Sequence, residues 1–361
     1  MTDDALHQFD ICFIHDVDPQ QLRTFLTQAF NAQKADFLMQ HSDWWHRDSP
    51  ARFVAVEHST DSIVGYCALI RSQVLLDDKP HDMYWWIDLI ILPAYRGLGI
   101  QRLLDEAAKQ TGHTQLGFPN ALAAIIHRKH GWGVRTEGTR WQYTLNLTAS
   151  ARLRAYDGAT GRVLRTLARV LNPAFRVVKR AGLLSVSHPH ITVTDEQKPD
   201  PLMLATIFTK HHPTQGTLTT QRDADFIRWR YLQAPYRDQL RFFIAYDQQQ
   251  PVLALITRLL TVKGLKTLRI LDVFGDLHNR EALTSLLNCA QQEAVRCHAD
   301  HILIVVTHDA LAGPLRDLRF VRDDDNPLAF CWLSDSDEQM HAIEQLQPYW
   351  VFADSDLDYS D

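Results

Sequence analysis

The chain has 361 residues, enough for two domains, and its 45% hydrophobic and 22% charged side chains are typical of a soluble globular protein. A formal charge of −6 offers no general attraction to nucleic acid, and five cysteines without Cys-x-x-Cys spacing argue against a disulfide framework or a zinc site. The sequence shows neither a signal peptide nor an apolar run long enough to span a membrane, so we expect a cytoplasmic protein.

The beginning of the chain predicts a strand, two helices and a hairpin, in that order. Short apolar runs indicate the strands, and apolar residues three and four positions apart indicate the helices. The predicted elements are a strand at 11–14, helices after Pro19 and over 37–45, and hairpin strands at 52–56 and 63–70.

The most informative stretch is 83–104. Residues 83–92 predict an apolar strand that Pro93 ends, and a turn with two glycines then leads into an amphipathic helix. A strand, a glycine turn and a helix N-terminus together favour an anion, because unpaired N–H donors and the helix dipole both attract phosphate. Arg96 adds a positive charge beside the turn. The alternative is an ordinary tight turn.

Residues 92–104, Leu-Pro-Ala-Tyr-Arg-Gly-Leu-Gly-Ile-Gln-Arg-Leu-Leu, resemble the acyl-CoA signature of the GNAT acyltransferases, Arg/Gln-x-x-Gly-x-Gly/Ala. Arg96 and Gly99 occupy the first two signature positions, whereas Gln101 stands where the family has Gly or Ala. The resemblance implies that acetyl-CoA or another acyl-CoA is the co-substrate. It also implies two groups of binding residues: Gly97, Leu98, Gly99, Ile100 and Gln101, whose amides hold the pyrophosphate, and Leu89 and Ile91, whose backbone pairs with the pantetheine arm.

The following elements complete a known order. After Gly112 the sequence predicts a strand at 115–118, a helix from Asn120 to Gly131 and a strand at 141–147. Over about 140 residues this is the element order of the GNAT fold, in which a mixed twisted sheet is flanked by helices. We therefore expect an α/β (α+β) fold whose ligand lies at the carboxyl ends of the central strands.

Residues 120–132 resemble the second GNAT signature, Asn-x-x-Ala-x-x-Leu-Tyr-x-Lys-x-Gly-Phe. Asn120 stands where the family contacts the pantetheine arm; a helix N-cap is the alternative, and both roles are compatible. His127 stands where the family has the tyrosine that protonates the leaving thiolate, and imidazole suits that chemistry. The alternative is that His127 and His130 are ordinary helix residues. We expect no metal site, because no carboxylate or cysteine lies near them in the sequence.

Asp88 is the second candidate catalytic residue. An unpaired carboxylate within an apolar strand costs free energy unless it is hydrogen-bonded or protonated. Asp88 is therefore either a structural group at a bulge or the base that takes a proton from the attacking amine. Asp82 and His81, at the start of the same strand, are weaker candidates.

Residues 152–182 form a basic connector with eight basic side chains and one acid, Asp157. Helical spacing predicts a helix that Asn172-Pro173 ends, and the proline-containing stretch 185–201 predicts a hinge. A basic amphipathic segment can lie on an anionic membrane or bind a polyanionic substrate. The alternative is a helix packed on the protein with its arginines in solvent.

The second half repeats the element order of the first at an offset of about 185 to 190 residues. Trp44 and Pro50 have counterparts in Trp229 and Pro235, and an apolar strand follows each pair. The stretch 274–281 lacks a Gly-x-Gly turn and holds two acids. We therefore expect two tandem GNAT-like domains: an acyl-CoA-binding domain at 1–150, the basic connector at 151–200, and a second, degenerate domain at 201–361.

The last residues, 349–361, combine aromatic and acidic side chains. A solvated tail is the simplest interpretation. In N-myristoyltransferases, which resemble this chain in being tandem members of the family, the terminal carboxylate serves as base. By its position at the end of the chain, Asp361 or one of its neighbours could reach back and bind a cationic acceptor.

The sequence as a whole predicts an acetyl-CoA-dependent N-acetyltransferase that acetylates a primary amine of a small molecule, for example an aminosugar, chiefly by positioning the reactants. Two alternatives belong to other classes. A FemABX-type aminoacyl transferase uses twin GNAT folds with aminoacyl-tRNA, and a non-catalytic protein would only bind CoA. The intact Arg-Gly-Leu-Gly turn favours CoA over tRNA.

Overall fold

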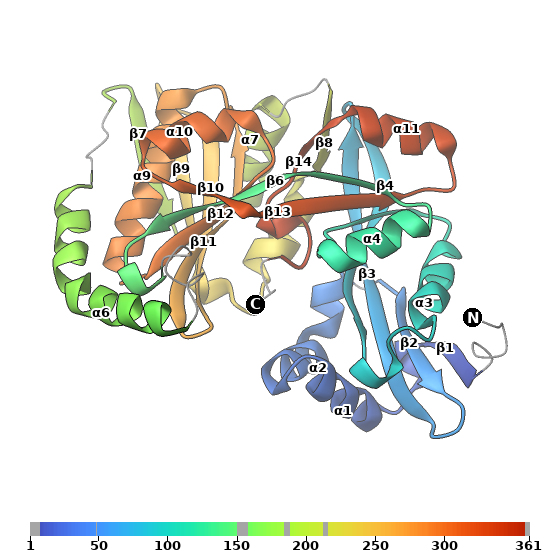
Figure 1. The fold of residues 1–361 in the computed structure, drawn as a ribbon. Coiled ribbons are helices and arrows are strands. Elements are labelled where there is room, and N and C mark those ends of the chain that lie inside the picture. Colours follow the sequence, from blue (N-terminus) through green and yellow to red (C-terminus); the bar gives the residue numbers. More distant parts are fainter. Residues whose placement is uncertain (1–7, 48, 150–157, 184–187, 212–215, 358–361) are drawn as a thin grey trace. The chain divides into compact units, whose positions relative to one another are not determined.

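The computed structural model of the protein describes residues 8–47, 49–149, 158–183, 188–211 and 216–357. The chain forms two units, each with its own strands and helices (Figure 1). Unit 1 comprises residues 1–135 and 329–346, and unit 2 comprises residues 136–328 and 347–361. The expected fold class, two tandem α/β units of mixed sheet flanked by helices, is confirmed.

Unit 1 contains the elements that the sequence predicts for residues 11–131. Its helices are α1 (Pro19–Ala29), α2 (Ala32–His46), α3 (Ile100–Lys109), α4 (Ala121–Lys129) and α11 (Asp337–Gln345). Its first five strands are β1 (Phe9–Phe13), β2 (Arg52–Glu57), β3 (Ser62–Leu76), β4 (Lys79–Ile91) and β5 (Thr114–Gly117). They pair in the order β1-β2-β3-β4-β5, with β4 and β5 parallel and the other neighbours antiparallel.

Local side chains position the helices of unit 1. Asp18 caps α1 and Asn31 caps α2, each accepting hydrogen bonds from backbone amides of the first turn. Gly65 on β3 lets α3 approach the sheet, since an added Cβ would lie only 3.1 Å from Ile100. Ile100 is almost completely buried there, so the start of α3 is fixed against the sheet.

Unit 2 repeats this arrangement with its own elements. Its helices are α6 (Gly158–Ala181), α7 (Pro201–His211), α8 (Ala224–Ile227), α9 (Arg280–Arg296) and α10 (Ala312–Asp317). Its strands include β7 (Ile191–Glu196), β8 (Thr217–Thr220), β9 (Leu240–Asp247), β10 (Gln250–Val262), β11 (Leu265–Gly275), β12 (His301–Val306) and β14 (Gln347–Tyr349). They pair in the order β12-β11-β10-β9-β7, while β8 pairs with β14.

Two long strands decide where the units divide. The end of β13 (Val321–Leu333) pairs with β5 in unit 1, where Cys331 lies opposite Gly117. Residues 139–144 of β6 (Gly133–Thr144) pair with β12 in unit 2. The units therefore differ from the consecutive segments 1–150, 151–200 and 201–361 that the sequence predicts, because each half of the chain supplies a strand to the sheet of the other half.

The connector and the hinge also differ from the prediction. Helix α6 continues through Pro173 to Ala181, and Figure 1 shows that it bends along its length. A proline bends a helix because it lacks an N–H donor and clashes with the preceding turn. The predicted hinge contains β7, which pairs with β9. Arg152, Arg154 and Asp157 lie outside the described residues.

The segment after β14 is buried in unit 2 as far as residue 357, so it is not a solvated tail. Arg230 donates hydrogen bonds to the carbonyl oxygens of Ala353 and Ser355, and Arg269 donates to that of Leu357. Asp361, the candidate for acceptor binding, lies outside the described residues.

A β-bulge interrupts β4 at Asp88. The register between β3 and β4 shifts there, and Asp88 has a left-handed φ of 55°. Its buried carboxylate forms an ion pair with Nζ of Lys34 at 2.8 Å and accepts a hydrogen bond from Nε1 of Trp45 at 3.2 Å. Because both partners belong to α2, the carboxylate ties that helix to the bulge.

His46, at the end of α2, lies in the same buried cluster. Its Nδ1 donates to the carbonyl oxygen of Ser42 at 2.8 Å, so its Nε2 accepts from the hydroxyl of Tyr66 at 3.1 Å. Burial lowers the pKa of His46 to about 4, although the charge of Asp88 opposes this effect. The imidazole is therefore neutral near pH 7.

We expect Lys34→Met to lower the free energy of unfolding by about 3–5 kcal/mol, because Asp88 would remain buried without its counter-charge. Urea unfolding followed by tryptophan fluorescence measures the loss. Arg23→Met is the matched control, since the ion pair between Arg23 and Asp36 is exposed and contributes at most about 1 kcal/mol. Equal losses in the two variants would contradict the role assigned to Lys34.

We expect the stability to fall as the pH decreases from about 6.5 to about 4. The pKa of His46 is lower in the folded chain, so the unfolded chain binds the proton first. The stabilisation is complete above pH 6.5 and is lost towards pH 4, by up to about 3 kcal/mol. Urea midpoints across this range should depend less on pH in His46→Gln than in His15→Gln, whose histidine is exposed. A pH dependence in His46→Gln equal to that of the wild type would refute the role assigned to His46.

Candidate functional site

Strand β4 extends beyond its neighbour β5. Their parallel pairing ends where Trp86 lies opposite Gly117, whereas β4 continues to Ile91. Among the described strand pairs, residues 87–91 therefore have no paired strand on the side of β5. Leu89 and Ile91, which the sequence places along the pantetheine arm, lie in this stretch and are half-buried against the core. The open edge suits an extended ligand that pairs with the backbone.

A short turn connects this edge to α3. The hydroxyl of Tyr95 donates to Oε2 of Glu57 at 3.0 Å, which attaches the turn to β2. Nε of Arg96 donates to the carbonyl oxygen of Ile91 at 3.1 Å, so the guanidinium lies between the end of β4 and the glycines. The positive charge of Arg96 is thereby held beside the predicted anion site.

Two glycines give the turn its open shape. Gly97 and Gly99 have φ values of 82° and 85°, a left-handed conformation that glycine adopts without a steric penalty. A Cβ on Gly97 would meet no atom within 4 Å, so the surface of the turn is not covered there. Gly99 is also the N-cap of α3 and has no side chain that could satisfy the first amides of the helix.

Gln101 contributes a donor of its own. Its side-chain Nε2 is buried and has no hydrogen-bond partner within the described part of the chain. A buried N–H without a partner costs about 1–3 kcal/mol. The residue that departs from the family signature is therefore larger and more polar than the Gly or Ala that the family has there.

These features fit an acyl-CoA. An extended pantetheine arm matches the open edge at residues 87–91, and a diphosphate matches the amides of residues 97–101 at the uncapped start of α3. Arg96 supplies a counter-charge beside them. The residues that the sequence resemblance implies therefore lie at the open edge and the open turn, and their binding of CoA stays a prediction.

The corresponding turn of unit 2 is closed by its own side chains. Oδ1 of Asp276 accepts from the amides of His278 and Asn279, at 3.1 and 3.3 Å. Oδ1 of Asn279 in turn caps α9 by accepting from the amide of Ala282 at 3.1 Å. These amides already have acceptors, and the carboxylate of Asp276 would repel a phosphate.

Asn120 caps α4, since its Oδ1 accepts from the amide of Ala123 at 2.9 Å. The capping interpretation is confirmed, and the contact with the pantetheine arm stays a prediction. Beyond this cap, α4 exposes two large apolar side chains, Leu122 and Ile125. The same end of α4 therefore presents a polar cap next to an apolar surface.

His127 is enclosed by tryptophan rings. The centroids of Trp132 and Trp86 lie 4.5 and 6.4 Å from that of the imidazole, which is only 3% exposed. Burial lowers the pKa of His127 to about 4, so the ring is neutral near pH 7. A neutral, enclosed imidazole is poorly placed to protonate a thiolate. Its role as proton donor stays a prediction, and the geometry favours the packing alternative.

His130 has a partner that the sequence analysis did not identify. Its Nδ1 lies 2.5 Å from Oδ2 of Asp105, a buried carboxylate on α3. Burial raises the pKa of Asp105, while His130 opposes this effect. The pair joins α3 to α4. Within the described ranges there is no group of three or more metal-ligating side chains.

Sequence reasoning found Asp88 but missed Lys34, His46 and Tyr66 around it. One signal was present in the sequence. Leu38 and Trp45 follow Lys34 by four and eleven residues, which places all three on one face of a helix. A lysine on the apolar face of a helix indicates a buried counter-charge. The hydroxyl of Tyr66 has no such signal, because its partner His46 is far from it in the sequence.

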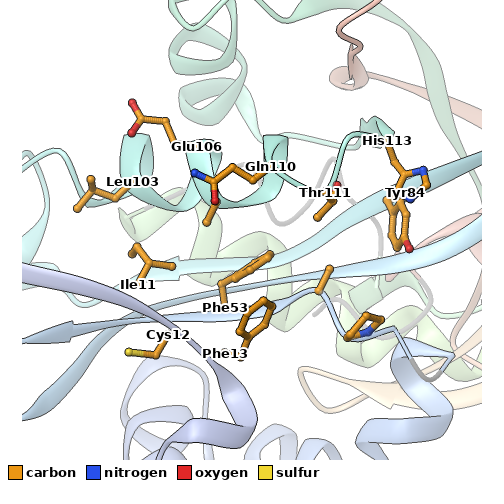
Figure 2. A pocket seen from close by; sticks show the side chains of 13 residues that line it. Ile11, Cys12, Phe13, Phe53, Tyr84, Leu103, Glu106, Gln110, Thr111 and His113 are labelled. Carbon is orange, nitrogen blue, oxygen red and sulfur yellow. The ribbon is translucent and has the colours of Figure 1, made fainter.

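Unit 1 contains a pocket of about 690 Å³ whose lining does not include Gly97 or Gly99. Figure 2 shows the residues that line it. Ile11 and Phe53 from β1 and β2 form one wall, and Glu106 from α3 and Gln110, just after the helix, form the opposite wall. Glu106 and Gln110 lie toward the end of α3, whereas the glycine turn precedes its first residue. The pocket is therefore separate from the candidate acyl-CoA site.

The sequence of unit 1 matches a known family. Residues 19–130 match the sequence model of the Acetyltransferase (GNAT) family. This range runs from the first residue of α1 to the residue after α4 and includes the open edge and the glycine turn. No curated protein sequence matches the chain.

Solved structures resemble the fold over about nine-tenths of the chain. N-myristoyltransferase from Saccharomyces cerevisiae with bound myristoyl-CoA has a TM-score of 0.60 and 11% identity, over 90% of this chain and 78% of that chain. GCN5-related N-acetyltransferases from Anabaena variabilis and Kribbella flavida have TM-scores of 0.58 and 0.56 and identities of 15% and 13%. They cover 90% and 91% of this chain and 72% and 71% of their own. Residues 19–130 thus resemble the GNAT family in sequence, and the solved structures share the fold of the chain.

Proposed function

We propose that the protein is a GNAT-type N-acyltransferase that transfers an acetyl group from acetyl-CoA to a primary amine of a small molecule, for example an aminosugar. One observation carries the proposal: in unit 1 the open edge of β4 leads directly into an open glycine turn at an uncapped helix. Backbone amides and carbonyls are positioned there as a CoA thioester requires.

The chain contributes chiefly binding and orientation. In this proposal the backbone of Leu89 and Ile91 holds the pantetheine arm, the amides of 97–101 hold the diphosphate, and Asn120 contacts the arm. When bound, acetyl-CoA supplies the activated acyl group. Holding it in one position makes attack by a neighbouring amine effectively intramolecular, which lowers the barrier without a covalent intermediate on the protein.

Asp88 was predicted either to support the bulge or to act as base. Its carboxylate oxygens are engaged by Lys34 and Trp45, which supports the structural role. We propose that Asp88 acts on the reaction through the shape of β4, and that the proton of the amine leaves through water. In this proposal Asp88 is not the general base.

The remaining parts of the proposal concern unit 2 and the location of the protein. The closed turn at Asp276 and Asn279 supports a second unit that does not bind CoA. The five cysteines are free thiols, which fits a reducing compartment such as the cytoplasm.

We expect the wild-type chain to bind CoA and to release it from acetyl-CoA in the presence of an accepted amine. Gly99→Val should raise the Kd for CoA about a hundredfold, ~2.8 kcal/mol, because a branched side chain strains the left-handed turn and shields its amides. Calorimetric titration measures binding, and a thiol assay with a panel of aminosugars and other small amines measures turnover.

Gly112→Val is the matched control, since Gly112 has a φ of 69° and lies at the other end of α3. It should cause a similar loss of stability while CoA still binds. Equal loss of CoA binding in both variants would contradict the assigned site. Binding of CoA without turnover of any amine would indicate a non-catalytic protein, and binding of aminoacyl-tRNA instead of CoA would indicate the FemABX alternative. A preference for myristoyl-CoA over acetyl-CoA would correct the acyl group.

We expect His127→Phe to keep kcat near the wild-type value, because a neutral imidazole enclosed by Trp86 and Trp132 acts in packing. The melting temperature should change instead. A proton donor contributes about 10²–10⁴-fold to the rate. A loss of that size, with unchanged CoA binding and an altered pH profile of kcat, would restore His127 as the proton donor.

A further inference from the structure

Helix α6 carries an apolar stripe that faces solvent. Before its proline, Val163, Leu167, Val170 and Leu171 recur at the spacing of one helical face, and each is more than half exposed. After the proline, Val177 and Val178 are exposed as well. A soluble helix normally buries such a stripe against its own core, so this exposed surface requires an explanation.

The opposite side of α6 attaches the helix to unit 2 through polar contacts. Arg176 forms an ion pair with Asp300 at 2.6 Å, Nζ of Lys179 lies 4.4 Å from the ring centroid of Tyr143, and Asn172 accepts from the amide of Leu147. These contacts fix which side of the helix faces outwards. The apolar exposure is therefore a property of the packed helix and not of a detached segment.

The charge of α6 identifies what covers the stripe. Residues 158–181 contain six basic side chains and no acidic one, although the whole chain has a formal charge of −6. Arg162, Arg169 and Arg180 remain exposed along the border of the apolar stripe. A surface that combines apolar acyl chains with negative headgroups complements both features. An apolar protein surface would leave the arginines without counter-charge.

We propose that α6 binds the surface of a membrane that contains anionic phospholipids. The apolar stripe enters the boundary between headgroups and acyl chains, and Arg162, Arg169 and Arg180 contact the phosphates. The helix lies on the membrane and does not cross it, since among the described residues no helix is long and apolar enough to span a bilayer. The proposal is independent of the acyltransferase activity.

Flotation of the full chain with lipid vesicles tests this inference. We expect the wild type to bind phosphatidylcholine vesicles that contain phosphatidylglycerol, and to bind pure phosphatidylcholine at least about tenfold more weakly. Leu167→Ser combined with Val170→Ser should reduce binding to the anionic vesicles by about tenfold or more. Arg162→Gln combined with Arg169→Gln should reduce binding and its dependence on salt.

Leu202→Ser combined with Val321→Ser is the matched control, because both side chains are exposed and lie outside α6. All these positions face solvent, so melting temperatures should stay close to that of the wild type. Absence of binding to the anionic vesicles at low salt would overturn the proposal. So would a wild-type dimer in sedimentation analysis that the Leu167 and Val170 substitutions convert to a monomer, since a second copy would then cover the stripe.

Discussion

The buried ion pair between Lys34 and Asp88 is the constraint on which the candidate acyl-CoA site depends. A non-glycine residue keeps a left-handed φ within a strand only when its surroundings hold it there, and the partners on α2 supply that restraint. The bulge falls just after Trp86, where β4 and β5 stop pairing. The edge that suits a pantetheine arm therefore exists because a helix outside the site fixes the bulge inside β4.

Unit 2 repeats this constraint with different side chains. The register between β10 and β11 shifts close to Asp272, whose fully buried carboxylate pairs with Arg222 at 2.9 Å and accepts from the hydroxyl of Tyr231. Arg222 also pairs with Asp354, near the end of the described chain. Unit 2 thus keeps the buried ion pair but has a closed turn. A buried ion pair is thus common to both units, whereas the open amides are a feature of the turn in unit 1.

Features that depend on neighbouring residues were predicted from the sequence, and features that depend on distant contacts were not. The spacing of apolar residues and the position of turn glycines involve residues that are close in the sequence. Most elements and the turn at Gly97 and Gly99 were therefore predicted. Asp88 and His127 were recognised as unusual, but their partners come from other parts of the chain. Only the structure shows that Lys34 neutralises Asp88 and that tryptophan rings enclose His127. Likewise, Pro173 predicts the end of a helix, yet packing of α6 on unit 2 continues it past the bend.

The pattern of a strand does not reveal which strand it pairs with. For this reason the sequence analysis missed that β6 pairs with β12 in unit 2 and that the end of β13 pairs with β5 in unit 1. The end of β13 pairs with β5, and without it that edge of the unit 1 sheet would be open. Since β5 must stay in place for the gap beside residues 87–91 to persist, the candidate site requires residues near the end of the chain. The second half of the chain therefore contributes to the sheet of unit 1, whether or not unit 2 binds a ligand.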